Sequence, residues 1–215
     1  MIVEREIGGR RLRAECPPAY ARMAENVLDV FARLAGSGSP PRPGVAIRFG
    51  WSRLRLDEDG DALRVTELDF AAWPEERRVP TIEITLAVLA AQTSLLHQLD
   101  VDGEDVCFEQ AVIAAPGALG APEIFLRRAG SSSAEDSGWL LGTVFDPEAL
   151  TRGDGLESVP IASLVGRRRA LLQALTLPTG FVVLFSGDVI EQVLDAAGRE
   201  RWPPAAPGAP AAPAE

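Results

Sequence analysis

The first part of the chain alternates between patterns that are typical of strands and of helices. Two short strand-like runs flank a Gly-Gly pair within residues 2–14, and such a pair favours a tight hairpin turn. From Pro17 to about Leu34, apolar residues recur at steps of three and four, which predicts an amphipathic helix that the prolines open. Residues 36–44 then mix Gly, Ser and Pro, a composition that ends the helix.

A strand region and a second helix are expected next. Apolar residues alternate from Val45 to Trp51 and then change phase, so we expect one strand with a bulge near residues 50–53. The acidic segment 57–61 contains an Asp-Gly pair typical of a hairpin turn, and it lacks the later Glu that an EF-hand calcium loop requires. Residues 82–99 carry a wide apolar arc, which predicts a mostly buried helix.

The second part of the chain reads as strands first and helices later. Three strand-like runs with short connections predict an antiparallel meander, and they are residues 106–114, 123–128 and 138–145. The remaining expected elements are a helix at 161–175, a buried strand at 181–185 and a last helix at 189–197, which Asp188 would cap.

Together these elements predict an α+β protein, with antiparallel sheet or sheets packed against about four helices. We expect the chain to split near residue 102 into an N-terminal α+β region, residues 1–102, and a second α+β domain, residues 103–202. Residues 203–215 contain only Pro, Ala and Gly before the final Glu, so a disordered tail is expected there.

Charge and cysteine usage restrict the classes of partner and site. The 31 acidic and 21 basic residues give a net charge of −10, which disfavours nucleic acid and anionic membranes and favours a basic partner. The two cysteines lie far apart, next to no CxxC motif or histidine, so neither a disulfide framework nor a zinc site is indicated. The start of the chain does not resemble a signal peptide and no apolar run is long enough to cross a bilayer, so we expect a cytoplasmic protein.

Sequence motifs for the common catalytic chemistries are missing. The single histidine, His97, lies on the predicted apolar helix, and no Gly-x-Ser-x-Gly elbow accompanies it. The chain has no lysine and no phosphate-binding glycine loop, which argues against a P-loop and against a Schiff base. We therefore predict no catalytic residue and no metal site, and we do not expect an enzyme.

The most distinctive stretch of the sequence is residues 125–142, which predicts a long hairpin. An apolar strand ends at a pair of arginines, a loop of Gly, Ser and acidic residues follows, and Asp-Ser-Gly-Trp opens the returning strand. We expect Asp136 to accept backbone hydrogen bonds within its own turn and Gly138 to supply a positive φ. Trp139 is then either a core anchor or part of a recognition site.

This stretch resembles the immunity-protein-33 family of bacterial polymorphic toxin systems. The shared pattern is an Arg at a strand end, a variable polar loop, D-S-G-W at 136–139 and a Gly three residues later. The segment Leu177-Pro178-Thr179-Gly180, which precedes a strand and follows a leucine-rich helix, is similar to the family's closing segment. The resemblance covers roughly residues 105–190. Because the family has a single Arg where this chain has two, Arg127 and Arg128 are both candidates for that position.

The resemblance implies a protein that binds and neutralises a cognate toxin without a cofactor. An acidic loop near residue 102 would meet a basic surface on that toxin. The residues expected to take part in binding are Arg127, Arg128, Asp136, Ser137, Gly138, Trp139, Gly142, Asp100, Asp102, Glu104 and Asp105. Two other classes of function stay open: an enzyme that holds a small ligand in the Arg127, Asp136 and Trp139 region, and a scaffolding module of a secretion system.

Overall fold

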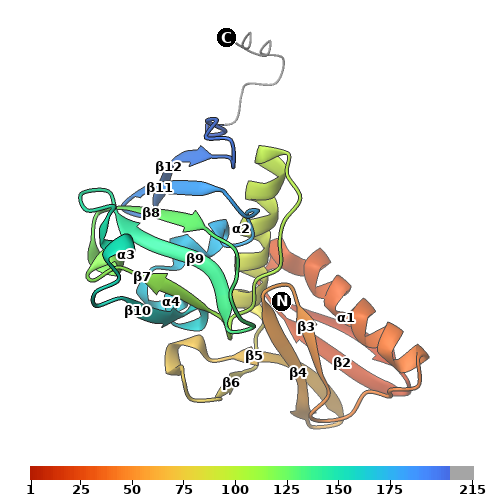
Figure 1. Ribbon diagram of the computed structural model, residues 1–215. Helices are drawn as coiled ribbons and strands as arrows, with labels where there is room; N and C mark the ends of the chain where they lie inside the picture. Colours follow the sequence, from red (N-terminus) through yellow and green to blue (C-terminus); the bar gives the residue numbers. More distant parts are fainter. Residues whose placement is uncertain (204–215) are drawn as a thin grey trace. The chain divides into compact units, whose positions relative to one another are not determined.

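The computed structural model describes residues 1–203, which divide into two compact units (Figure 1). The first unit comprises Met1–Ala91 with Asp105–Phe108, and the second comprises Gln92–Glu104 with the chain from Glu109 onward. Each unit contains a six-stranded sheet and helical segments, which confirms the predicted α+β class. The predicted domain boundary near residue 102 stays a prediction, and the predicted tail lies outside the described residues except for Pro203. Within residues 1–203, no helix is both long enough and apolar enough to span a membrane.

The sheet of the first unit has the strand order β1-β2-β5-β4-β3, and β6 also pairs with β5. Its strands are β1 (Ile2–Ile7), β2 (Arg10–Glu15), β3 (Ala46–Phe49), β4 (Ser52–Asp59), β5 (Ala62–Leu68) and β6 (Arg78–Val79). The predicted Gly-Gly hairpin joins β1 to β2, and both glycines have positive φ. The acidic turn is also confirmed as a hairpin, between β4 and β5, whereas β2 and β5 pair in parallel.

The predicted bulge near residues 50–53 is wrong. Gly50 and Trp51 form the two-residue turn of a hairpin in which Phe49 pairs with Ser52. Gly50 has a φ of +58°, a backbone conformation that glycine adopts at little cost. The change of apolar phase in the sequence therefore marks a reversal of the chain, because a second strand begins there with its own alternation.

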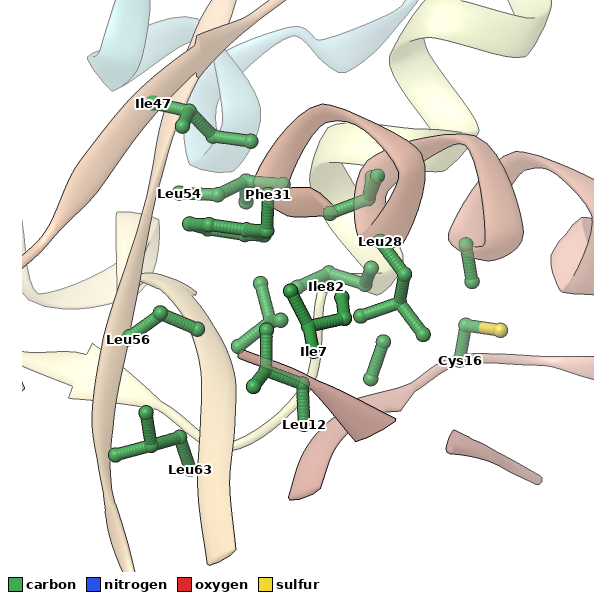
Figure 2. Packing of buried hydrophobic residues seen from close by; sticks show 14 of the residues in the cluster. Ile7, Leu12, Cys16, Leu28, Phe31, Ile47, Leu54, Leu56, Leu63 and Ile82 are labelled. Carbon is green, nitrogen blue, oxygen red and sulfur yellow. The ribbon is translucent and has the colours of Figure 1, made fainter. Parts of the chain in front are cut away.

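Helix α1 (Ala21–Gly36) covers one face of this sheet, and the core of the first unit lies between them (Figure 2). The predicted helix is confirmed, with one 3₁₀ turn at Pro18–Tyr20 before it. Large side chains of this core, from the helix and from the strands, include Leu12, Leu28, Phe31, Leu54, Leu56 and Leu63.

Two buried side chains hold the first turn of α2 (Glu83–Leu99), the helix that the sequence predicts. The carboxylate of Glu67 accepts the backbone N–H groups of Ile84 and Thr85 at 2.9 and 2.7 Å. Trp51 donates its Nε1–H to the carbonyl oxygen of Thr85 at 3.2 Å. A helix N-terminus leaves four N–H groups without an intrahelical partner, and Glu67 satisfies two of them.

The sheet of the second unit has the strand order β10-β7-β9-β8-β11-β12. Its strands are β7 (Ala111–Ala114), β8 (Glu123–Arg128), β9 (Asp136–Thr143), β10 (Glu157–Pro160), β11 (Val182–Ser186) and β12 (Val189–Leu194). The predicted long hairpin is confirmed as the antiparallel pair of β8 and β9. The predicted meander is wrong, because β7 pairs in parallel with β9 and β9 therefore lies between β7 and β8.

The predicted last helix at 189–197 is also wrong, since this segment forms strand β12. Ser186 pairs with Val189, so Gly187 and Asp188 are the two residues of a tight hairpin turn. Gly187 has a φ of +56°, which suits such a turn. Asp188 therefore lies in a strand connection, and the pairing with β11 decides the conformation of a segment that is too short to form a stable helix alone.

The helix predicted at 161–175 is confirmed in part. It consists of α4 (Ile161–Arg167), extended backbone at Arg168 and a 3₁₀ segment at Arg169–Ala174. Its buried leucines and the buried residues of β8, β9 and β11 form the core of the second unit. Gln92, in the second half of α2, donates to the carbonyl oxygen of Leu172 at 2.9 Å and so holds that part of the helix against the 3₁₀ segment.

Candidate functional site

Trp139 occupies the inner face of β9, where it is 0% exposed. Its Nε1–H donates to the carbonyl oxygen of Leu175 at 2.7 Å. The guanidinium carbon of Arg128 lies 5.6 Å from the centre of the indole ring, within the range of a cation–π contact. Trp139 is therefore a core anchor beneath the hairpin, and the alternative that its side chain contacts a partner directly does not fit this burial.

Arg128 is buried beside Trp139 and binds the chain that follows the 3₁₀ segment. One of its terminal nitrogens donates to the carbonyl oxygens of Leu177 at 2.6 Å and of Leu175 at 3.3 Å. The other lies 3.5 Å from the carboxylate of Glu104. Burial lowers the pKa of Arg128, and the neighbouring Glu104 opposes that change.

The two adjacent arginines face opposite sides of the sheet, because successive residues of a strand alternate. Arg128 points into the core, whereas Arg127 is exposed on the outer face. Asp136 lies in the turn at the start of β9. Trp139 and Arg127 therefore cannot line one pocket, and this arrangement disfavours an enzyme site built from Arg127, Asp136 and Trp139.

Asp136 closes the turn that the sequence predicts. Its carboxylate accepts the backbone N–H of Gly138 at 2.7 Å and the backbone N–H and hydroxyl of Ser132 at 2.8 and 2.9 Å. Gly138 has a φ of +75°, and a Cβ at this position would lie 2.5 Å from the carbonyl oxygen of Ala129, so only glycine fits. The prediction of an Asp-stabilised turn with a glycine at positive φ is confirmed.

These hydrogen bonds make the turn sensitive to pH. Partial burial opposes ionisation of Asp136, but the hydrogen bonds from Ser132 and Gly138 outweigh it and hold the pKa of Asp136 below its usual value. A carboxyl with a lowered folded-state pKa adds stability above its unfolded pKa and loses that contribution as the pH falls through the folded value. We therefore expect Asp136→Asn to lower the free energy of unfolding by about 1 kcal/mol at neutral pH and by less near pH 2.

The measurement is chemical denaturation of both proteins at a series of pH values. The matched control is Glu135→Gln, since Glu135 is the exposed neighbour and its contact with the hydroxyl of Ser133 is long, at 3.4 Å. If the difference between Asp136→Asn and the original protein does not change with pH, the ionised carboxylate does not stabilise the turn.

Two further residues of the motif also connect neighbouring strands. Ser137 is buried and its hydroxyl donates to the carbonyl oxygen of Ala111, in β7, at 2.6 Å. A Cβ on Gly142 would lie 2.4 Å from Cζ of Phe125, so the glycine allows the phenyl ring to lie across β9. Most residues of this motif thus hold the strands and the turn together: Arg127 is exposed, Asp136 is partly buried and the others are buried.

The four acidic residues between positions 100 and 105 have different environments. Asp100 and Asp102 are exposed. Glu104 accepts the backbone N–H of Thr179 at 2.8 Å and its hydroxyl at 3.0 Å. These bonds and Arg128 lower the pKa of Glu104 although partial burial opposes the change. Asp105 belongs to the first unit, where its carboxylate lies 3.4 Å from a terminal nitrogen of Arg48.

Asp100 ends helix α2 in an unusual backbone conformation. Its φ is +52°, in the left-handed region. Among residues 1–203, Asp100 is the one residue other than glycine that has a positive φ. The N–H of Val101 donates to the carbonyl of Leu96, and that of Asp100 donates to the carbonyl of His97, both at 3.2 Å. This is a Schellman C-cap, a position where glycine is usual. The same residues and Asp102 line a surface hollow of about 270 Å³.

Sequence reasoning missed a larger hollow on the outer face of the second sheet. It has a volume of about 320 Å³ and is lined by Phe125, Arg127, Val144, Pro147, Leu150, Thr151, Val182 and Leu184. Val144 and the adjacent Phe145 are 40% and 77% exposed. The available sequence signal was an apolar Val-Phe pair directly before Asp-Pro, at the end of the strand predicted for residues 138–145; in the structure β9 ends at Thr143 and the pair lies in the turn that follows.

Within residues 1–203, no group of three or more His, Cys, Asp or Glu side chains is arranged to hold a metal ion.

Comparison with known proteins finds one relationship. The family model described as the Imm33-like domain matches residues 91–196, which begin inside α2 and end just after β12. No curated protein and no solved structure matched the chain. The matched segment contains the Asp-Ser-Gly-Trp turn, the arginine pair and the Leu-Pro-Thr-Gly connection, which are the features on which the resemblance rests. Residues 91–196, just under half of the chain, therefore match the Imm33-like domain family.

Proposed function

We propose that this protein is an immunity protein that binds and neutralises a cognate bacterial toxin. The observation that carries the proposal is the match of residues 91–196 to the Imm33-like domain, a family name that denotes immunity proteins. The net charge of −10 supports a partner with a basic surface, because opposite charges speed the encounter of two proteins.

The exposed acids at the end of α2 are the part of the predicted site best placed to meet such a surface. Asp100 costs stability in two ways, since it adopts a left-handed conformation and puts a negative charge at a helix C-terminus. A glycine there would avoid both costs. Residues that reduce stability while remaining exposed are candidates for binding, and this supports Asp100 as a contact with the toxin, with Asp102 as its exposed acidic neighbour.

The direct test uses the proteins encoded beside this chain in its genome. Each neighbouring candidate toxin is produced in cells with and without this protein, and growth is measured together with co-purification of the pair. The proposal expects one neighbour to stop growth when produced alone, to be harmless when produced together, and to form a stable complex. If no neighbouring protein is toxic, or if this protein neither binds nor protects, the proposal is wrong.

We further expect the acidic loop to control the rate of association. Reversing Asp100 and Asp102 to Arg should lower the association rate constant roughly tenfold or more at low salt, because it replaces attraction by repulsion. The rate of the original protein should fall steeply with salt, since the Debye length shrinks from about 10 Å at 0.1 M to about 3 Å at 1 M. Dissociation should change less in both cases. Stopped-flow mixing with the toxin at several ionic strengths measures these rates.

The control for this experiment is neutral substitution of the other acidic segment, residues 57–61, which comprises the end of β4 and the two-residue turn to β5. This substitution changes the net charge by about as much as the Asp100 and Asp102 reversals do, but in the first unit. An association rate that is flat with salt and unaffected by the Asp100 and Asp102 changes would mean that these acids are solvated surface without a role in binding.

A further inference from the structure

The outer face of the second sheet carries apolar side chains from neighbouring strands. Phe125 of β8 pairs with Leu184 of β11, and Arg127 pairs with Val182, so these four residues form a compact group on one face. The turn after β9 and helix α3 (Ala149–Arg152) form the remaining walls. A hollow of about 320 Å³ between them has room for one large apolar side chain.

The glycine of the family-like motif shapes this hollow. A Cβ at position 142 would lie 2.4 Å from the ring of Phe125 and 3.2 Å from Cδ1 of Leu150. Gly142 therefore leaves room beside β9 for the phenyl ring of Phe125 and for the side chain of Leu150 in α3. A glycine is thus required at position 142 by packing on the outer face of the sheet, whereas Trp139 and Arg128 pack on the inner face.

An exposed aromatic residue is held at the rim by an ordered turn. The backbone N–H of Asp146 donates to the carbonyl oxygen of Thr143 at 3.3 Å and contacts its hydroxyl at 3.2 Å. Both carboxylate oxygens of Asp146 are bonded by Arg152, at 3.0 and 2.5 Å. Phe145 lies at the tip of this turn and is 77% exposed. Its presentation in an ordered turn lowers the entropy that binding would otherwise cost.

Arg127 gives the hollow an unneutralised positive charge. Across residues 1–203, its guanidinium takes part in no ion pair and no side-chain hydrogen bond, whereas Arg152 and Asp146 neutralise each other. A partner that fills the hollow would thus bind more tightly if it carried a carboxylate, next to its apolar group, that pairs with Arg127. Aromatic residues, phenylalanine included, and arginine are also enriched in the cores of protein–protein interfaces.

We infer that this outer face, the hollow together with Phe145, is where the toxin docks, and that the toxin inserts an apolar side chain with a neighbouring carboxylate directed at Arg127. The inference rests on the proposed function and adds the contact surface and the chemistry of its occupant. It differs from the role of the acidic loop, because an apolar anchor slows dissociation while exposed charges speed encounter.

The test measures toxin binding by titration calorimetry and dissociation by surface plasmon resonance. Phe145→Ser and Arg127→Glu should each raise the dissociation constant at least tenfold, mainly through faster dissociation. Phe145→Tyr should keep most of the affinity. The matched controls lie in the first unit. Ile2→Ser alters an apolar residue that is 47% exposed, and Arg10→Glu alters an exposed arginine. Both variants should bind the toxin like the original protein.

Hydrogen–deuterium exchange of the complex provides a measurement that needs no variant. We expect the amides of the turn at 144–147 and of α3 to become protected when the toxin binds. If the toxin binds while this segment is unprotected and both Phe145→Ser and Arg127→Glu keep full affinity, the docking surface lies elsewhere and the inference alone fails. If the original protein binds no toxin, the proposed function fails and this inference fails with it.

Discussion

Replacing Trp139 by alanine is expected to lower the free energy of unfolding by about 3 to 5 kcal/mol, as large buried aromatic residues do. The substitution removes a fully buried ring and leaves a cavity under the β8–β9 hairpin. It also leaves the carbonyl oxygen of Leu175 without the indole N–H that it accepts at 2.7 Å. Chemical denaturation followed by circular dichroism gives the size of the loss.

A conservative variant separates the packing contribution from the hydrogen bond. Trp139→Phe keeps most of the buried apolar surface but removes the Nε1 donor, so it should cost less than the alanine variant and more than an exposed substitution. A melting temperature of Trp139→Ala within about two degrees of the original protein would contradict the assignment of Trp139 as a core anchor.

Replacing Arg128 by alanine should cost about 2 to 4 kcal/mol, because the guanidinium binds two buried carbonyl oxygens and pairs with Glu104. Lysine should restore little of this loss. It carries one ammonium group, which cannot reproduce the planar arrangement through which Arg128 reaches both carbonyls and Glu104.

The control for Arg128 is its neighbour in the same strand. Arg127→Ala changes the same residue type one position earlier, on the exposed face, and should alter stability by no more than about 0.5 kcal/mol. Equal losses from the two alanine variants, measured by chemical denaturation, would show that the opposite orientations of the two arginines do not determine their contributions.

Features governed by residues close in sequence could be predicted from the sequence. The hairpin between β8 and β9 and the Asp136 turn follow from a polar loop with a glycine between two apolar runs. The parallel pairing of β7 with β9 depends on residues far apart in the chain, and no local pattern encodes it. Val189–Leu194 is a different case, because it pairs with β11 through the two-residue turn Gly187-Asp188, a local hairpin signal that the helix prediction overlooked.

The candidate site could be predicted only in part for a similar reason. The sequence identified the arginine pair and the Asp-Ser-Gly-Trp turn, and strand alternation explains why Arg127 and Arg128 face opposite sides. The outer hollow is formed by β8, β11, the turn after β9 and helix α3, so its residues come together only in the folded second unit. The apolar turn at Phe145 indicates a binding surface only through its exposure, which the sequence does not give.

The two buried indoles give each unit its own internal reporter. The Nε1–H of Trp51 is bonded to Thr85 within the first unit, and that of Trp139 is bonded to Leu175 within the second. Such protons exchange with solvent only when the surrounding structure opens. Their two signals in a nuclear magnetic resonance spectrum therefore record, in one sample, whether the halves of the chain open in a single cooperative event or independently. Equal opening free energies would mean one folding unit, and unequal ones would mean that the Imm33-like half has a stability of its own.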